Sequence, residues 1–104
     1  MSPAEVAELV AAEINGEWSR SNAHGVDLRK CLVAPAKRLY EDSFAEGRTI
    51  ELWLVLEERP ADGSGYKIVF DETTRQFGLA TSSRGGRDVF IGFYGNFIAT
   101  LEAM

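Results

Sequence analysis

The chain contains one cysteine and one histidine, Cys31 and His24, which form its only candidate pair of nucleophile and base. A catalytic thiolate needs a base within hydrogen-bond distance and a third group that orients the base, a role for which Asp27 is available. However, Cys31 is followed by Leu32 and Val33, a setting typical of a small buried hydrophobe, and His24 lies in a polar segment. The pattern therefore favours a core thiol and a surface histidine over a catalytic pair.

The loop Arg84-Gly85-Gly86-Arg87 is a second candidate site, because it precedes a segment that we expect to be helical. Two arginines and the free backbone N–H groups of a helix N-terminus can hold a phosphate, sulfate or carboxylate. The spacing matches neither the dinucleotide fingerprint nor the P-loop, and Asp88 would compete for the same N–H groups as a helix cap. We expect a solvated loop here, with anion or small-ligand binding as the alternative function.

Acidic residues around one predicted hairpin offer a third kind of chemistry, general acid–base catalysis or the binding of a hard cation. They are Glu57, Glu58, Asp62, Asp71 and Glu72. The ligand spacing of a calcium loop is absent, and charged strand ends commonly protect sheets against edge aggregation. One histidine and one cysteine are also too few for a zinc site. The sequence thus predicts no metal site, no cofactor and no catalytic residue, and an enzyme is the least favoured class.

The strand that must position most of these groups is expected at residues 49–58, the longest apolar run of the chain. Its side chains alternate between two faces. One face carries Ile50, Leu52, Leu54 and Leu56, and the other carries Glu51, Trp53, Val55 and Glu57. A strand that is apolar on both faces at its centre belongs inside a sheet.

The face centred on Trp53 is the most interesting candidate surface. If the helices cover the face of Leu52, Leu54 and Leu56, the opposite face stays open unless another segment covers it. That open face would carry Trp53 and Val55 and, if the register allows, Val69, with Lys67 and Glu51 around them. A tryptophan-centred apolar patch with a charged rim is typical of a protein-binding surface. The alternative, that residues 18–39 cover this face within the monomer, is equally compatible with the sequence.

The elements before the central strand are a helix and a segment with two interpretations. Ser2, Pro3 and Glu5 form a helix start with a capping box, and Asn15-Gly16 provides the stop. Residues 35–47 suit either a helix, with Pro35 at its start and a glycine at its end, or a strand that Pro35 confines to an edge or interrupts with a bulge. We favour a strand that continues through Tyr40.

After the central strand, the spacing predicts two further strands and a second helix. Residues 66–71 alternate apolar and polar side chains, and residues 77–81 form another short strand. Asp88 is expected to cap a helix that runs to Met104 with bulky and small stripes. The predicted fold is a single α+β domain over residues 1–104. Its antiparallel meander of three to four strands is flanked by an N-terminal and a C-terminal helix, with both helices on one sheet face.

Composition limits the function classes. The 104 residues are 45% hydrophobic and carry a formal charge of −5, which argues against sequence-independent nucleic-acid binding. A single cysteine excludes an intrachain disulfide and suggests a reducing compartment. The N-terminus does not resemble a signal peptide, and no apolar run approaches the length of a membrane span, so a cytoplasmic location without membrane association is expected.

The segments 50–58, 66–72, 77–80 and 89–104 together resemble short uncharacterised bacterial proteins. That resemblance covers about half of the chain and implies neither an activity nor any catalytic residue. We therefore expect a non-enzymatic interaction domain that uses the Trp53 face for self-association or for a protein partner. The alternative is a small anion-binding or ligand-binding protein that uses the loop from Arg84 to Arg87.

Overall fold

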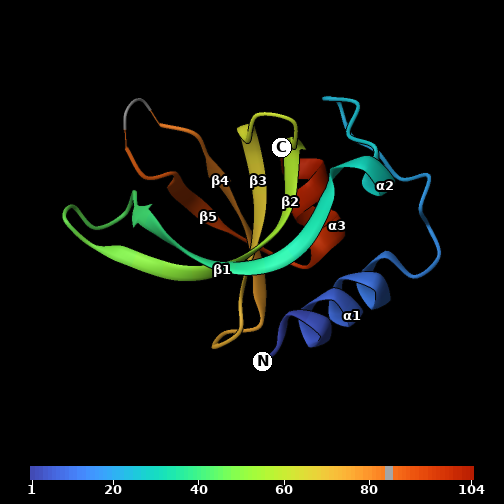
Figure 1. Ribbon diagram of the computed structural model, residues 1–104, viewed down its shortest axis with the longest axis horizontal. Coiled ribbons are helices and arrows are strands. Elements are labelled where there is room, and N and C mark those ends of the chain that lie inside the picture. Colours follow the sequence, from blue (N-terminus) through green and yellow to red (C-terminus); the bar gives the residue numbers. More distant parts are fainter. Residues whose placement is uncertain (84–85) are drawn as a thin grey trace.

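A computed structural model, which describes residues 1–83 and 86–104, consists of five strands and three helices (Figure 1). The strands are β1 (Leu32–Asp42), β2 (Thr49–Arg59), β3 (Ser64–Asp71), β4 (Gln76–Thr81) and β5 (Val89–Gly95). The helices are α1 (Pro3–Ile14), α2 (Leu28–Cys31) and α3 (Phe97–Ala103). The prediction of an α+β fold with an antiparallel sheet between terminal helices is confirmed, with one strand more than expected.

Each strand pairs antiparallel with the next, and the sheet then closes on itself. The closing contact is short and parallel, because only Glu41 with Val89 and Asp42 with Phe90 are paired between β1 and β5. We call this contact the seam. Its backbone hydrogen bonds include Glu41 N–H to Asp88 O at 2.9 Å and Ser43 N–H to Phe90 O at 3.2 Å. The seam thus joins two parts of the chain that are far apart in sequence.

The N-terminal helix begins and ends as its sequence predicts. The Ser2 side chain accepts a hydrogen bond from Glu5 N–H, and the Glu5 carboxylate accepts one from Ser2 N–H, so the capping box is complete. Asn15 ends the helix in the left-handed conformation with φ of 51°. Trp18 then packs against the same core cluster as α1.

The ambiguous segment 35–47 is a strand up to Asp42 and a turn thereafter, as favoured. Asp27 caps the short helix α2 by accepting from Arg29 N–H at 3.0 Å, and β1 follows directly. Between Leu32 and Ala36 the β1–β2 register shifts, because the chain bulges around Pro35, which has no N–H to donate.

The predicted second helix is wrong over its first half. Residues 89–95 form strand β5, and the helix begins only at Phe97, where the Asn96 side chain caps it. The glycines explain the difference, since Gly92 has φ of +143° and Gly95 has φ of +89°, values that an α-helix does not accommodate. The bulky residues of this segment have helix-like spacing, but its pairing with β4 makes it a strand.

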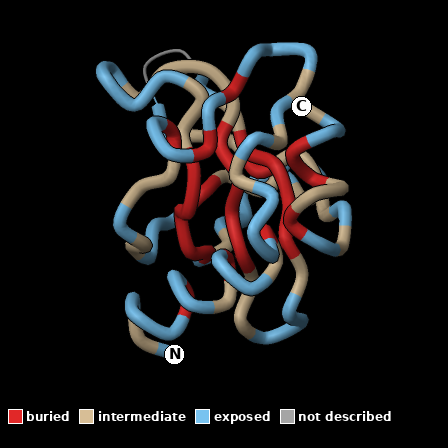
Figure 2. The backbone as a smooth tube through the Cα atoms, turned by 90° about the vertical axis from the view of Figure 1, so that its right-hand side faces the viewer, coloured by how far each residue is buried: buried red, intermediate tan, exposed pale blue. Residues whose placement is uncertain are grey.

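At the centre of β2 the helices pack on the face of Trp53, opposite to the predicted one, although Leu56 of the predicted face also joins their cluster. One core cluster joins Val6, Val10 and Ile14 of α1 and Phe97 and Leu101 of α3 to Trp53 and Val55 of β2. Leu52 belongs instead to a second cluster inside the barrel, together with Tyr40, Val69, Ala80 and Phe90. Figure 2 shows the buried residues concentrated along the central strands. Both faces of the sheet are thus core, one under the helices and one inside the barrel.

The position of Glu72, at the turn after β3, links α1 to β1 and gives a pH-dependent contribution to stability. Its carboxylate contacts the Lys37 ammonium and lies 2.7 Å from the N-terminal ammonium of Met1. The hydrogen bond with Lys37, followed by that with the N-terminus, lowers the pKa of Glu72 from 4.5 to about 2. Because the folded state holds this carboxylate ionised, its contribution is complete above pH 4.5 and is lost as the pH falls toward 2.

We therefore expect Glu72→Gln to flatten the acid limb of the stability curve. Urea unfolding at a series of pH values should show the wild type losing more stability than the variant between pH 4.5 and 2. Glu8→Gln, at an exposed position of α1, is the matched control and should leave the slope unchanged. Parallel curves for wild type and Glu72→Gln would contradict the assigned contact.

Candidate functional site

The predicted Trp53 surface is part of the core. Trp53 is 5% exposed and Val55 lies beside it beneath α1, whereas Val69 points into the barrel, so the expected patch is split between two interior faces. Of its predicted rim, only Glu51 is exposed. The Lys37 ammonium lies over the Trp53 ring, 5.3 Å from its centroid. Trp53 is buried because the helices pack on its side of β2.

The predicted anion loop lacks the helix that was to support it. Arg84 and Gly85 lie outside the described residues, and Gly86 and Arg87 lead into strand β5 instead of a helix N-terminus. The Arg87 guanidinium lies 3.7 Å from the Glu41 carboxylate, across the seam. The physical argument for anion binding here, a set of free helical N–H groups, therefore no longer holds.

One end of the barrel interior contains an ion pair between Lys67, which was predicted on the rim of the Trp53 face, and Asp88. Lys67 is 1% exposed, and its ammonium lies 3.1 Å from the Asp88 carboxylate. The same ammonium donates to Gly63 O at 2.6 Å and to Ser82 Oγ at 3.3 Å, so its three N–H groups have acceptors. Asp88, predicted to be a helix cap, is instead the counter-ion of Lys67.

The hydroxyl of Tyr40, inside the barrel, is buried without a hydrogen-bond partner among the described residues. Burial of the ring raises the pKa of its phenol, so the hydroxyl stays neutral. A neutral, orphaned hydroxyl in an apolar cluster is a local cost to folding.

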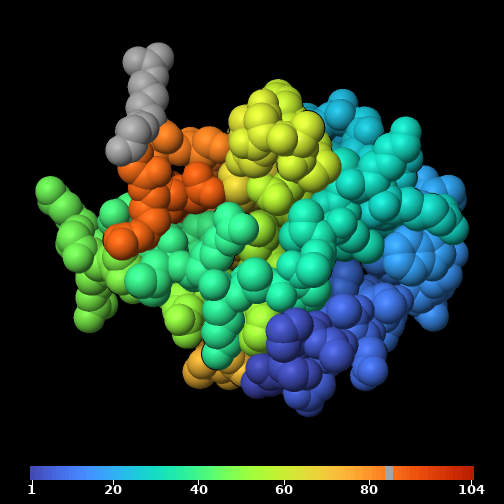
Figure 3. All heavy atoms as spheres, viewed as in Figure 1, coloured from blue at the N-terminus to red at the C-terminus, as the bar shows by residue number. Residues whose placement is uncertain are grey.

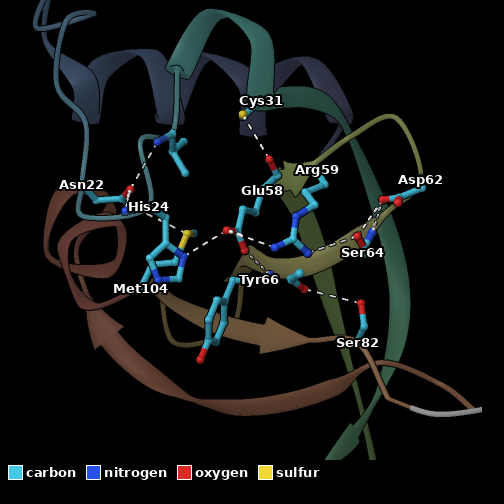
Figure 4. Close-up of polar contacts among 12 residues, drawn as sticks. Asn22, His24, Cys31, Glu58, Arg59, Asp62, Ser64, Tyr66, Ser82 and Met104 are labelled. Carbon is cyan, nitrogen blue, oxygen red and sulfur yellow. Dashed lines mark hydrogen bonds and ion pairs between the residues drawn. The ribbon is translucent and has the colours of Figure 1, made fainter.

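His24 and Cys31, the candidate catalytic pair that the sequence disfavours, each contact Glu58, at different atoms (Figure 4). His24 Nδ1 lies 3.0 Å from Glu58 Oε2, while the Cys31 thiol donates to the backbone carbonyl of Glu58 at 3.6 Å. Glu58 Oε1 accepts from Tyr66 N–H at 3.0 Å. The Asn22 carboxamide binds Leu101 O at 2.9 Å from the same loop.

The Glu58 carboxylate is the anchor of this polar cluster. The hydrogen bond from Tyr66 N–H lowers the pKa of Glu58, partial burial opposes that effect, and the contact with His24 lowers the pKa further. The carboxylate is thus ionised at neutral pH and ties the loop of His24 to the end of β2. Since Arg20 of the same loop also pairs with Glu102 at 2.7 Å, the cluster fastens this loop and α3 to the barrel.

The acidic residues predicted to surround one hairpin divide between opposite ends of β3. Glu57 and Glu58 lie near the end of β2 and Asp62 in the turn that follows, whereas Asp71 ends β3 and Glu72 lies in the β3–β4 turn. Asp62 accepts from Ser64 N–H and Oγ, which shapes its own turn. Among the described residues, no three His, Cys, Asp or Glu side chains gather closely enough to hold a metal ion.

In the part of the chain that the structure describes, three large apolar side chains other than Met1 are exposed, on β1, on the β1–β2 turn and on β5. They are Leu39, Phe44 and Tyr94, and Phe44 at the turn is 72% exposed. Figure 3 shows the turn projecting from the body of the molecule at the left. We call residues 41–46 the aromatic turn. Phe44 belongs to the segment 35–47, and only the strand interpretation of that segment leaves it at a turn.

The aromatic turn is held in place from both sides. Phe44 N–H donates to Asp42 Oδ1 at 2.9 Å, and the Phe44 ring meets Phe90 edge to face with centroids 6.3 Å apart. A Cβ on Gly92 would lie 3.7 Å from the Phe44 ring, so the ring rests on the backbone of β5. One side of the ring is thus supported while most of it faces outward.

No known protein-family model matches the chain, and comparisons with curated proteins and with solved structures also found no match. Within the described residues, no helix combines the length and the apolar character needed to cross a bilayer. Functional conclusions therefore rest on the surfaces of this chain itself.

Proposed function

We propose that the protein is a non-enzymatic interaction domain and that its contact surface is the aromatic turn. The observation that carries this proposal is the 72% exposure of Phe44 on a turn whose backbone is fixed by hydrogen bonds. A supported aromatic ring loses little conformational entropy on binding, which is why such side chains dominate interface energetics. The Trp53 face, first expected in this role, is occupied by α1.

The charges around Phe44 favour a basic protein as the partner. The aromatic turn contains Glu41, Asp42 and Glu46 and no lysine or arginine, and the whole chain carries −5. Arg87 offsets part of this charge through its pairing with Glu41. A partner that offers an apolar recess surrounded by basic side chains would complement both the ring and its surroundings.

The polar groups that the fold gathers support a non-enzymatic role. The Glu58 carboxylate oxygens contact Tyr66 N–H and the His24 ring. The Lys67 ammonium contacts the Asp88 carboxylate and donates to two further acceptors. Each of these groups fastens one segment of the chain to another. Such satisfied groups stabilise the fold and leave no activated nucleophile or base at these two clusters.

We expect Phe44→Ser to leave the fold intact and to weaken partner binding about thirtyfold, the effect of losing a central aromatic anchor. An exposed side chain contributes little to stability, so the unfolding midpoint should change only slightly. The partner is captured with the wild type, identified and purified, and its affinity for wild type and variant is then measured by calorimetry.

Thr73→Ser, at the exposed β3–β4 turn, is the control and should bind like the wild type. Equal affinity of wild type and Phe44→Ser would refute the proposal. Sedimentation over a wide concentration range tests whether the partner is instead a second copy of the chain. That would be the case if the wild type self-associates and Phe44→Ser does not.

A further inference from the structure

An apolar pocket of about 210 Å³ opens between α1 and β1, away from the aromatic turn. Its lining residues include Ala7, Val10 and Ala11 of α1, Val33 and Pro35 of β1, and Trp18. For comparison, an engineered apolar cavity of about 150 Å³ binds benzene. The pocket is therefore large enough for an aromatic ring or a short alkyl chain.

The pocket exists because two sequence features coincide. Pro35 forces the bulge that lifts this part of β1 out of register with β2. Opposite the bulge, α1 presents alanines at positions 7 and 11, whose small side chains do not fill the space. In Figure 3, α1 in dark blue meets β1 in turquoise near the bottom of the molecule, right of its centre.

Trp18 also lines a second, polar hollow of about 300 Å³. The hollow contains the side chains of Arg20, Asp27 and Arg29. Arg20 is paired with Glu102, and the Asp27 carboxylate caps α2, so both are already engaged. The Arg29 guanidinium lies 5.4 Å from the Trp18 ring centroid and takes part in none of the ion pairs among the described residues.

We propose that these two hollows form one binding site for a small amphipathic carboxylate. The alkyl or aromatic tail occupies the apolar pocket, and the carboxylate pairs with Arg29 beside the Trp18 ring. Arginine suits this role, because its planar guanidinium can both stack on an aromatic face and bind a carboxylate with two N–H groups. The site is independent of the aromatic turn, so either proposal can fail without the other.

The test uses the full chain and three probes with the same tail, namely octanoate, octanol and octylamine. Amide chemical shifts should move at Ala7, Ala11 and Val33 on titration with octanoate. Affinity should rise roughly fourfold for each CH₂ added from butanoate to octanoate until the pocket is full, as expected for burial of alkyl groups. Octanol should bind more weakly than octanoate, and octylamine more weakly still.

Two variants with matched controls separate the roles of tail and head. Arg29→Gln should weaken octanoate about tenfold, the loss of one charge-assisted contact, and leave octanol unchanged, while Lys30→Gln should affect neither. Ala11→Leu should fill the pocket and abolish binding of all three probes, while Ala12→Leu, exposed on the same helix, should not. The site is refuted if octanoate shows no saturable binding, or if Ala11→Leu binds octanoate as tightly as the wild type. The carboxylate assignment is refuted if octanol binds more tightly than octanoate.

Discussion

Gly78→Ala is expected to destabilise the protein by about 3 kcal/mol, at the upper end of the range for overpacking a core. A Cβ at position 78 would lie 2.5 Å from the backbone carbonyl oxygen of Gly92 and 2.9 Å from the Phe90 ring. Side chains can rotate away from such a contact, but the backbone oxygen of a paired strand cannot. Relief therefore requires β4 and β5 to separate, which breaks their pairing.

Urea unfolding of the purified variant measures this cost, and Gly16→Ala is the informative control. Gly16 has φ of +80° and nothing within 4 Å of its would-be Cβ, so alanine there is strained without a clash. Its cost should be about 1 kcal/mol, the penalty of the left-handed conformation. If the two substitutions cost the same, the close approach of β4 and β5 at Gly78 has no energetic importance.

Asp88→Ala is the second large effect, an expected loss of about 3 kcal/mol. The variant leaves the Lys67 ammonium inside the barrel without its counter-ion, since Lys67 is 1% exposed. The reverse change, Lys67→Met, should cost less, because the Asp88 side chain is 28% exposed and water can solvate it. Because Lys67 is more deeply buried than Asp88, removal of Asp88 should cost more stability than removal of Lys67.

A double-mutant cycle by urea unfolding at neutral pH tests this asymmetry. The double variant Lys67→Met with Asp88→Ala should recover most of the stability lost in Asp88→Ala, since no buried charge remains. High salt should change the result little, because screening acts weakly on buried pairs. A larger loss for Lys67→Met than for Asp88→Ala would show that the hydrogen bonds of Lys67 to Gly63 and Ser82 matter more than its charge.

Local patterns predicted the elements whose signals are strong and unopposed. The capping box at Ser2 and the alternation in β2 and β3 specify these elements from neighbouring residues alone. β5 was misassigned because Phe90, Phe93 and Phe97 fit helical spacing, and only pairing with β4 shows that the first two belong to a strand. Tertiary pairing overrides such local spacing.

The site could be predicted less well than the fold, for a related reason. Trp53 and Leu52 are both apolar, and nothing within β2 indicates which of them meets the helices and which faces the barrel interior. The pairing of Lys67 with Asp88 and the support of Phe44 by β5 depend on contacts between distant segments. The sequence alone shows that such residues are polar or apolar, but it does not show which distant residues contact one another.

The shortness of the seam couples recognition to the mechanics of the barrel. Two residue pairs close the sheet, so the barrel can open there at a lower free energy than global unfolding requires. The aromatic turn starts at the end of β1, on one side of the seam, and its Phe44 ring packs on β5, on the other side. A partner that contacts Phe44 and β5 together therefore binds only the closed barrel. By linkage, such a partner raises the free energy needed to open the barrel at the seam, because its binding is lost when the barrel opens.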